Sequence, residues 1–308
     1  MTADSPLPLL RPDLRLTRRG HDLRLDSLTP LPPGARRAGE WLERWARERP
    51  DHTFLAERDA DGGWRRLTYA GALAAVEGLG SSLLAAGASV QRPVMVLSDN
   101  SIDAALVTLG AMHAGVPVSP VSSAYSLQSP SLRRLRLLAS VLDPGVVFAD
   151  DPERYGAALA ALTDGGATVL TSLPGGHHTV DELARAPRSD ALARAHAATG
   201  PDTIAKVLFT SGSTGEPRGV VNTQRMLTSS QDSLATCWPF LEATPPVVVD
   251  WLPWSHTFGG NHNFFLVLRH GGTLHIDAGR PAPGLLDTTL ANLAEVSPTL
   301  WFNVPRGF

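Results

Sequence analysis

The sequence predicts an α/β protein with largely parallel sheets flanked by helices. From residue 68 onward, short apolar runs rich in β-branched residues alternate with helical segments, as βαβ crossovers require. The 308 residues are 43% hydrophobic and 19% charged, a globular balance that argues against disorder and against coiled-coil or collagen-like architectures. The formal charge of −3 gives no reason to expect binding to nucleic acid or to an anionic membrane.

The N-terminal elements come before this alternation. Residues 1–38 are rich in Pro and Arg and predict a loosely structured leader that lies on the body. Apolar residues at helical spacing predict a helix over 39–49, with Pro50 after its end. Residues 52–67 predict a hairpin, because two β-type runs flank the turn sequence DADGG.

Capping residues and apolar runs mark the later elements. Thr68 begins a helix that Gly87 ends, and Ser101 begins another that continues to about Ala114. Strands are predicted at 93–99, 116–120, 146–150, 167–171, 206–210, 247–252, 272–277 and 300–304. The Gly- and His-containing segment 173–202 predicts a surface connection between two sub-units, which would cover about 68–198 and 199–308.

Two features bear on the compartment. Cys237 is the only cysteine, which excludes an intramolecular disulfide, and a buried apolar filler is its expected role. Residues 104–132 contain no charged side chain, but three prolines divide the stretch, so we expect no membrane span. The N-terminus lacks the apolar core of a signal peptide. We therefore expect a cytoplasmic protein.

The segment 208–221, LFTSGSTGEPRGVV, carries the strongest chemical signal. An apolar strand ends at a loop in which glycines let backbone N–H groups converge on one anion, while hydroxyls and a guanidinium add donors. This equipment predicts a polyphosphate site, with a flexible polar turn as the alternative. The predicted phosphate-binding residues are Thr210, Ser211, Gly212, Ser213, Thr214, Gly215 and Arg218.

The loop differs from two common nucleotide motifs. A P-loop needs G-x-x-x-x-G-K-[ST], and Pro217 stands where its second glycine belongs. The dinucleotide fingerprint G-x-G-x-x-G occurs nowhere in the chain. A nucleotide site of another type is required.

The sequence TSGSTGEPRG resembles the phosphate-loop signature of the adenylate-forming superfamily, which contains acyl- and aryl-CoA synthetases, peptide-synthetase adenylation domains and luciferases. A second segment, WLPWSHTFGGN (251–261), is similar to the family's P-x-x-H-x-x-G motif. The resemblance covers roughly 39–308 and is strongest to feruloyl-CoA synthases. It implies a fold in which the chain is an incomplete AMP-binding N-terminal domain.

The resemblance also implies a two-step reaction. An aromatic carboxylic acid attacks the α-phosphate of ATP to give an acyl-adenylate and pyrophosphate, and coenzyme A then displaces AMP. Residues 210–215 and Arg218 would hold the β- and γ-phosphates and stabilise the leaving pyrophosphate. The polyphosphate implies Mg²⁺, although no carboxylate is clearly placed to bind it. The expected partners are therefore ATP, CoA and a small-molecule acid.

His256 is the predicted catalytic residue, because the matching family histidine lies beside the acyl site. A core histidine satisfied by the backbone is the alternative. The predicted acyl-pocket residues, in which the glycines would leave room for a flat aromatic acid, are Trp254, Thr257, Phe258, Gly259, Gly260 and Asn261. The spacing of the four histidines between 256 and 275 does not match a zinc motif, so no metal site is predicted.

The chain departs from the family pattern in two ways. The loop lysine of the family is Arg218 here. Composition is the favoured explanation, because Lys206 is the one lysine among 27 basic residues, and a tuned affinity for phosphate is the alternative. No segment that resembles the adenine-binding region, or the C-terminal lid domain with its catalytic lysine, follows the strand expected at 300–304. We therefore expect a fragment that is inactive by itself and that exposes an unpaired apolar edge.

Three functions remain open at this stage. The leading one is the N-terminal part of an ATP-dependent ligase that joins a hydroxycinnamate, such as ferulate, to coenzyme A. The second keeps the reaction but uses a benzoate or aliphatic acid. The third is a catalytically incompetent half-domain with an interaction role or none. The sequence does not determine the oligomeric state.

Overall fold

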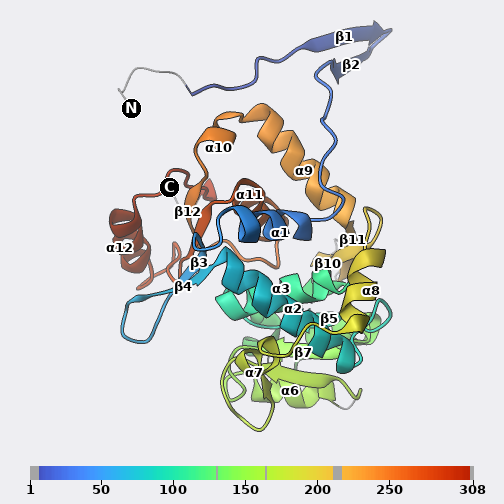
Figure 1. Ribbon diagram of the computed structural model, residues 1–308, viewed down its shortest axis with the longest axis vertical. Coiled ribbons are helices and arrows are strands. Elements are labelled where there is room, and N and C mark those ends of the chain that lie inside the picture. Colours follow the sequence, from blue (N-terminus) through green and yellow to red (C-terminus); the bar gives the residue numbers. More distant parts are fainter. Residues whose placement is uncertain (1–6, 130, 164, 211–216, 306–308) are drawn as a thin grey trace.

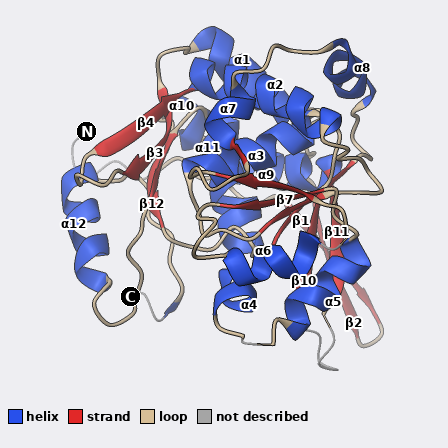
Figure 2. Ribbon diagram, turned by 90° about the horizontal axis from the view of Figure 1, so that it is seen from below, coloured by secondary structure: helices blue, strands red, loops and turns tan. Residues whose placement is uncertain are grey.

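A computed structural model describes residues 7–305, apart from 130, 164 and 211–216. Its strands form one two-stranded, one seven-stranded and one four-stranded sheet. Helices cover the two larger sheets (Figures 1 and 2). The predicted α/β class with parallel sheets flanked by helices is confirmed.

The seven-stranded sheet is parallel except at one edge. Only β10 and β11 pair in antiparallel fashion, while β10 also pairs with β6 in parallel. In spatial order its strands are β11 (Arg218–Thr223), β10 (Ile204–Thr210), β6 (Val118–Pro120), β5 (Val94–Val96), β7 (Val146–Ala149), β8 (Thr168–Thr171) and β9 (His178–Thr179).

The four-stranded sheet combines distant parts of the chain, in the order β12 (Val247–Asp250), β13 (Thr273–Ile276), β3 (Thr53–Arg58) and β4 (Trp64–Thr68). The predicted 52–67 hairpin forms β3 and β4, and β3 lies parallel to β13. The sheets divide the chain differently from the predicted sub-units. Strands β10 and β11 belong with the earlier elements, whereas β3 and β4 belong with the later ones.

The helices follow the predicted capping residues. The Thr68 side chain accepts a hydrogen bond from the N–H of Gly71, Ser101 accepts one from Ala104, and Gly87 has a φ of +86°. The helices are α1 (Gly39–Glu48), α2 (Tyr69–Ala85), α3 (Ile102–His113), α4 (Ser123–Leu127), α5 (Arg133–Leu142), α6 (Gly156–Thr163), α7 (Val180–Ala184), α8 (Asp190–Ala198), α9 (Gln224–Cys237), α10 (Phe240–Ala243), α11 (Phe264–His270), α12 (Leu286–Val296) and the π-helix η1 (Phe258–Asn263).

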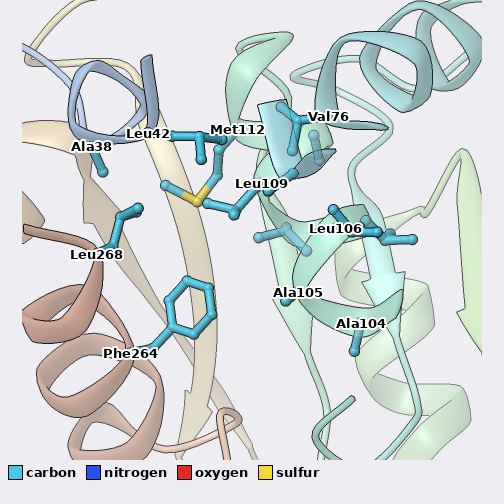
Figure 3. Close-up of a cluster of buried hydrophobic side chains, with 14 of the residues drawn as sticks. Ala38, Leu42, Val76, Ala104, Ala105, Leu106, Leu109, Met112, Phe264 and Leu268 are labelled. Atoms are coloured by element: carbon cyan, nitrogen blue, oxygen red, sulfur yellow. The ribbon is translucent and has the colours of Figure 1, made fainter. Parts of the chain in front are cut away.

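The uncharged stretch near residue 104 is explained by α3, in which every residue except Asp103 is buried. Figure 3 shows Leu109 and Met112 of α3 among side chains from α1 and α11, including Leu42 and Phe264. The helix therefore connects the packing of the two larger sheets. Within the described residues, no helix is both long enough and apolar enough to cross a membrane.

Two segments contain more regular structure than the sequence predicted. The segment 173–202, predicted as a surface connection, contains β9, α7 and α8. Helices α7 and α8 pack on α2 at two glycines: a Cβ on Gly78 would lie 2.1 Å from the Ala184 carbonyl oxygen, and one on Gly80 would lie 2.8 Å from Leu192. The predicted leader contains a hairpin of β1 (Leu14–Arg19) and β2 (Asp22–Ser27), which extends beyond α9 in Figure 1.

Two other expectations were also wrong. Residues 300–304 form no strand, and a single bridge pairs Leu300 with Val248. The Asn303 side chain accepts a hydrogen bond from the N–H of Val304, so this local bond replaces a ladder bond. Cys237 is exposed at the end of α9 rather than buried.

Candidate functional site

The β10–β11 hairpin positions both described ends of the predicted phosphate loop. Thr210 is directly opposite Arg218 in the antiparallel register, and both residues are exposed. Because β10 runs parallel to β6, this point lies at the carboxyl edge of the sheet, where α/β proteins bind ligands. The predicted site residues Ser211, Gly212, Ser213, Thr214 and Gly215 lie outside the described residues.

A cavity of about 340 Å³ lies between the two larger sheets, which we call the inter-sheet cavity. Its walls come from the carboxyl ends of β5 and β6 and from the segments that follow β12 and β13. Asn100 joins the two sides: its amide nitrogen donates to the Leu252 carbonyl at 2.9 Å, and its oxygen accepts from the Trp254 N–H at 3.0 Å. The cavity is therefore held at a fixed position between the sheets.

Lys206 lines this cavity and is a site residue that the sequence reasoning missed. Its side chain is only 2% exposed, and Nζ donates to the Gly260 carbonyl at 3.2 Å and to Asn261 Oδ1 at 3.1 Å. Burial lowers the pKa of Lys206 from 10.5 to about 7. The signal in the sequence was that this one position keeps lysine in an arginine-rich chain.

His256 lies on the surface between the phosphate-loop hairpin and the cavity. Its residue is exposed, so the reading of His256 as a core histidine is wrong. The imidazole lines a small hollow of about 90 Å³ together with Phe209, the neighbour of Thr210. That hollow shares Ser255 and residues 120–122 with the inter-sheet cavity. The predicted histidine is thus adjacent to both parts of the site.

The glycines after His256 serve the packing of the main chain. A Cβ on Gly259 would lie 2.3 Å from the Leu252 carbonyl oxygen, and one on Gly260 would lie 2.2 Å from that of Trp254. The space expected for an aromatic acid at these glycines is therefore filled by backbone. Trp254 and Gly260 still line the cavity, and Asn261 holds Lys206.

The other two predicted pocket residues, Thr257 and Phe258, are exposed. Phe258 belongs to an aromatic group on one side of η1, in which its ring centroid lies 5.3 Å from that of His262 and 6.2 Å from that of Phe302. Phe302 also stacks on Trp238 at 6.2 Å. This apolar surface brings together α9, η1 and the 300–304 segment.

Among the described residues, the four histidines between 256 and 275 form no group that could hold a metal ion. One group does exist elsewhere, in which ligand atoms of Glu43, His113 and His196 lie within 4.8 Å of one another. Arg37 already donates to His196 Nε2 at 2.9 Å and lies 3.7 Å from Glu43 Oε1. Because this cation fills the place of a metal, we interpret the group as an ion-pair network.

The chain matches the family of AMP-binding enzymes over residues 42–308. It belongs to this family. One relative is the 3-[(3aS,4S,7aS)-7a-methyl-1,5-dioxo-octahydro-1H-inden-4-yl]propanoyl:CoA ligase of Mycobacterium tuberculosis, with 29% identity over 76% of this chain and 45% of the relative. Another is sulfoacetate–CoA ligase of Cupriavidus necator, with 32% identity over 63% of this chain and 34% of the relative.

Solved structures of adenylate-forming enzymes have the same fold. ATP-bound MatB from Rhodopseudomonas palustris is 25% identical, with a TM-score of 0.61 over 84% of this chain and 48% of that protein. A luciferase-like enzyme from the mealworm Zophobas morio is 18% identical, with a TM-score of 0.69 over 87% of this chain and 60% of that protein. The AMP-binding chain described here spans about half the length of the curated relatives it matches.

Proposed function

We propose that this AMP-binding chain takes part in the ATP-dependent activation of an aromatic carboxylic acid, followed by its transfer to coenzyme A. The proposed acid is a hydroxycinnamate such as ferulate. The carboxylate attacks the α-phosphate of ATP and forms an acyl-adenylate, and pyrophosphate leaves. The sulfur of CoA then attacks the acyl carbonyl and AMP leaves.

The arrangement of the hairpin, His256 and the inter-sheet cavity is the observation that supports this proposal. Phe209, next to Thr210, lines the same hollow as His256, and that hollow adjoins the cavity. A nucleotide held by its phosphates at the hairpin and an acid held in the cavity would therefore meet near His256. Bringing the two reactants together in this way is a major part of catalysis in a two-substrate reaction.

The described residues of the loop fit a polyphosphate. Arg218 is exposed and opposite Thr210, so its guanidinium and the Thr210 hydroxyl can both donate to phosphate oxygens at the strand ends. Donation to these oxygens stabilises the charge that develops on the leaving pyrophosphate. Mg²⁺, which we propose as the accompanying ion, would neutralise phosphate charge, and it commonly binds through phosphates and waters with few protein ligands.

The cavity lining supports an aromatic acid. Trp254 and Phe264 contribute aromatic surface, and the volume of about 340 Å³ lies within the range of small-molecule sites. A benzoate or an aliphatic acid is the runner-up. In our proposal, His256 positions the substrate carboxylate and assists thioester formation by hydrogen bonding.

The first test measures binding to the 308-residue chain. Arg218→Ala should weaken the binding of MgATP about tenfold or more, because a charge-assisted hydrogen bond is lost. Arg225→Ala is the matched control, since Arg225 is exposed and pairs with Asp202. Equal affinity in the Arg218 variant and the wild type would contradict the proposed phosphate site.

The second test measures the adenylation step. In the full-length protein, exchange of labelled pyrophosphate into ATP that depends on ferulate supports the proposal, whereas exchange only with benzoate or aliphatic acids favours the runner-up. The 308-residue chain alone should show no exchange. His256→Ala should reduce the rate while changing the free energy of unfolding by less than about 0.5 kcal/mol, as for other exposed positions. Unfolding of this variant would restore a structural role for His256.

A further inference from the structure

Residues that line the inter-sheet cavity carry more hydrogen-bond donors than they use. When it is protonated, Lys206 Nζ has three hydrogens and donates to two acceptors. Trp254 Nε1 and Ser98 Oγ are buried without a hydrogen-bond partner among the described residues, and both residues line the cavity. Trp254 is only 8% exposed. Buried polar groups are normally satisfied, and an indole N–H can only donate, so the missing partner of Trp254 is an acceptor, to which the Ser98 hydroxyl can also donate.

The charged groups around the cavity do not supply this acceptor. Asp277 uses both of its carboxylate oxygens, accepting from the Gly279 N–H, from Asn292 and from Thr289. Asp99 accepts from Ser123 at 2.6 Å and from Arg154 at 3.3 Å.

Arg280, the remaining charged group of the lining, is exposed and is itself a donor. No neighbouring charge contributes to the lowered pKa of Lys206, which burial alone explains. The lysine is therefore left without a counter-ion in the described part of the protein.

The position of Lys206 on β10 separates it from the phosphate site. It precedes Thr210 by four residues on the same strand, which corresponds to about 13 Å at 3.3 Å per residue. Because side chains alternate along a strand, the two residues lie on the same face of β10. An acid whose carboxylate faces the phosphates could thus extend its other end toward Lys206.

We propose that Lys206, Trp254 and Ser98 form a subsite for an oxygen atom at the end of the acid opposite the activated carboxylate. This oxygen belongs to a phenolic hydroxyl or a phenolate, and it accepts hydrogen bonds from Lys206 Nζ and Trp254 Nε1. This inference rests on the proposed function and adds a determinant of specificity to it. A site built to hydrogen-bond an oxygen rejects analogues that lack it, because its own donors are then left unpaired.

The single lysine makes this subsite directly observable. Protein labelled with ¹⁵N at lysine Nζ has one lysine side-chain signal, and ferulate and unsubstituted cinnamate serve as probes. Quenching of tryptophan fluorescence gives the affinity for each acid. We expect ferulate to bind at least tenfold more tightly than cinnamate and to shift the Nζ signal, while cinnamate leaves the signal near its free position.

Two variants separate recognition from a structural role. Lys206→Met and Trp254→Phe should both reduce the ratio of ferulate affinity to cinnamate affinity. Trp254→Phe keeps an aromatic ring but removes the N–H donor, and it answers the question if the lysine variant does not fold. Equal weakening of both acids, or ferulate binding without movement of the Nζ signal, would refute the subsite alone. Failure of both acids to bind wild-type protein would refute the proposed aromatic substrate, and the subsite with it.

Discussion

Replacing Lys206 by Met should change the pH dependence of stability in a predictable way. Burial lowers the pKa of Lys206 from 10.5 to about 7 in the folded chain. Between these pH values the unfolded chain binds the proton more tightly, so the free energy of unfolding of the wild type rises as pH increases from about 7 to 10.5. Below pH 7 the buried lysine is charged, and its desolvation lowers the free energy of unfolding by the full amount. At 1.36 kcal/mol per pH unit, this amount is about 5 kcal/mol.

Methionine has no charge to desolvate, but the variant leaves the Gly260 carbonyl and Asn261 Oδ1 without their donor. Two unpaired acceptors cost about 2–6 kcal/mol together at every pH. Relative to the wild type, the variant should therefore gain about 5 kcal/mol of stability as the pH falls from 10.5 to 6. At pH 10.5 it should be less stable than the wild type by about 2–6 kcal/mol.

Urea unfolding, followed by tryptophan fluorescence between pH 6 and 10.5 at constant ionic strength, measures this difference. Arg225→Met is the control, because it also replaces a basic residue by Met but at an exposed position, where no burial cost is removed. If the difference in the free energy of unfolding between Lys206→Met and the wild type stays constant with pH, the wild type does not contain a buried ammonium without a counter-ion.

Three further changes test other parts of the fold. Burial raises the pKa of Asp250 from 3.8 to about 7, so the free energy of unfolding of the wild type should fall by about 4 kcal/mol as pH rises from 3.8 to 7. Asp250→Asn should remove this pH dependence. Urea midpoints measured between pH 4 and 8 will test this. Gly260→Ala should lower the free energy of unfolding by about 1–3 kcal/mol, because the added Cβ would meet backbone atoms. Gly156→Ala should lower it by nothing measurable, because the space around Gly156 is open. Equal effects of the two substitutions in thermal unfolding would contradict the packing argument. Thr68→Ala should cost about 1 kcal/mol in the same assay through loss of a helix cap, and an unchanged midpoint would show that the cap is dispensable.

Local signals in the sequence were sufficient for most elements. Helix caps at Thr68 and Ser101 and the turn glycines of the 52–67 hairpin act within a few residues, so their outcome could be predicted. The pairing of β3 with β13 joins segments more than 200 residues apart, and no local pattern specifies it. This is why the predicted sub-unit boundary did not match the sheets.

Short motifs predict candidate site residues but not what encloses them. Thr210, Arg218 and His256 were predicted from such patterns; Thr210 is paired with Arg218, and His256 lines a hollow together with Phe209. Lys206 became a site residue only because η1 brings Gly260 and Asn261 against β10. The glycines of η1 likewise looked like space for a ligand, because the sequence does not show which backbone approaches them.

The late completion of the four-stranded sheet has a consequence for synthesis of the chain. Strand β3 ends at Arg58, but its parallel partner β13 ends at Ile276, 218 residues later. At about 5–20 residues per second, a ribosome needs roughly 10–40 s to make that interval. During this time Phe54 and Leu55, both fully buried in the finished fold, have only the β4 side of their sheet in place. The edge of β3 that later pairs with β13 thus stays unpaired and apolar throughout this interval, the period in which the nascent hairpin is most prone to wrong strand pairing.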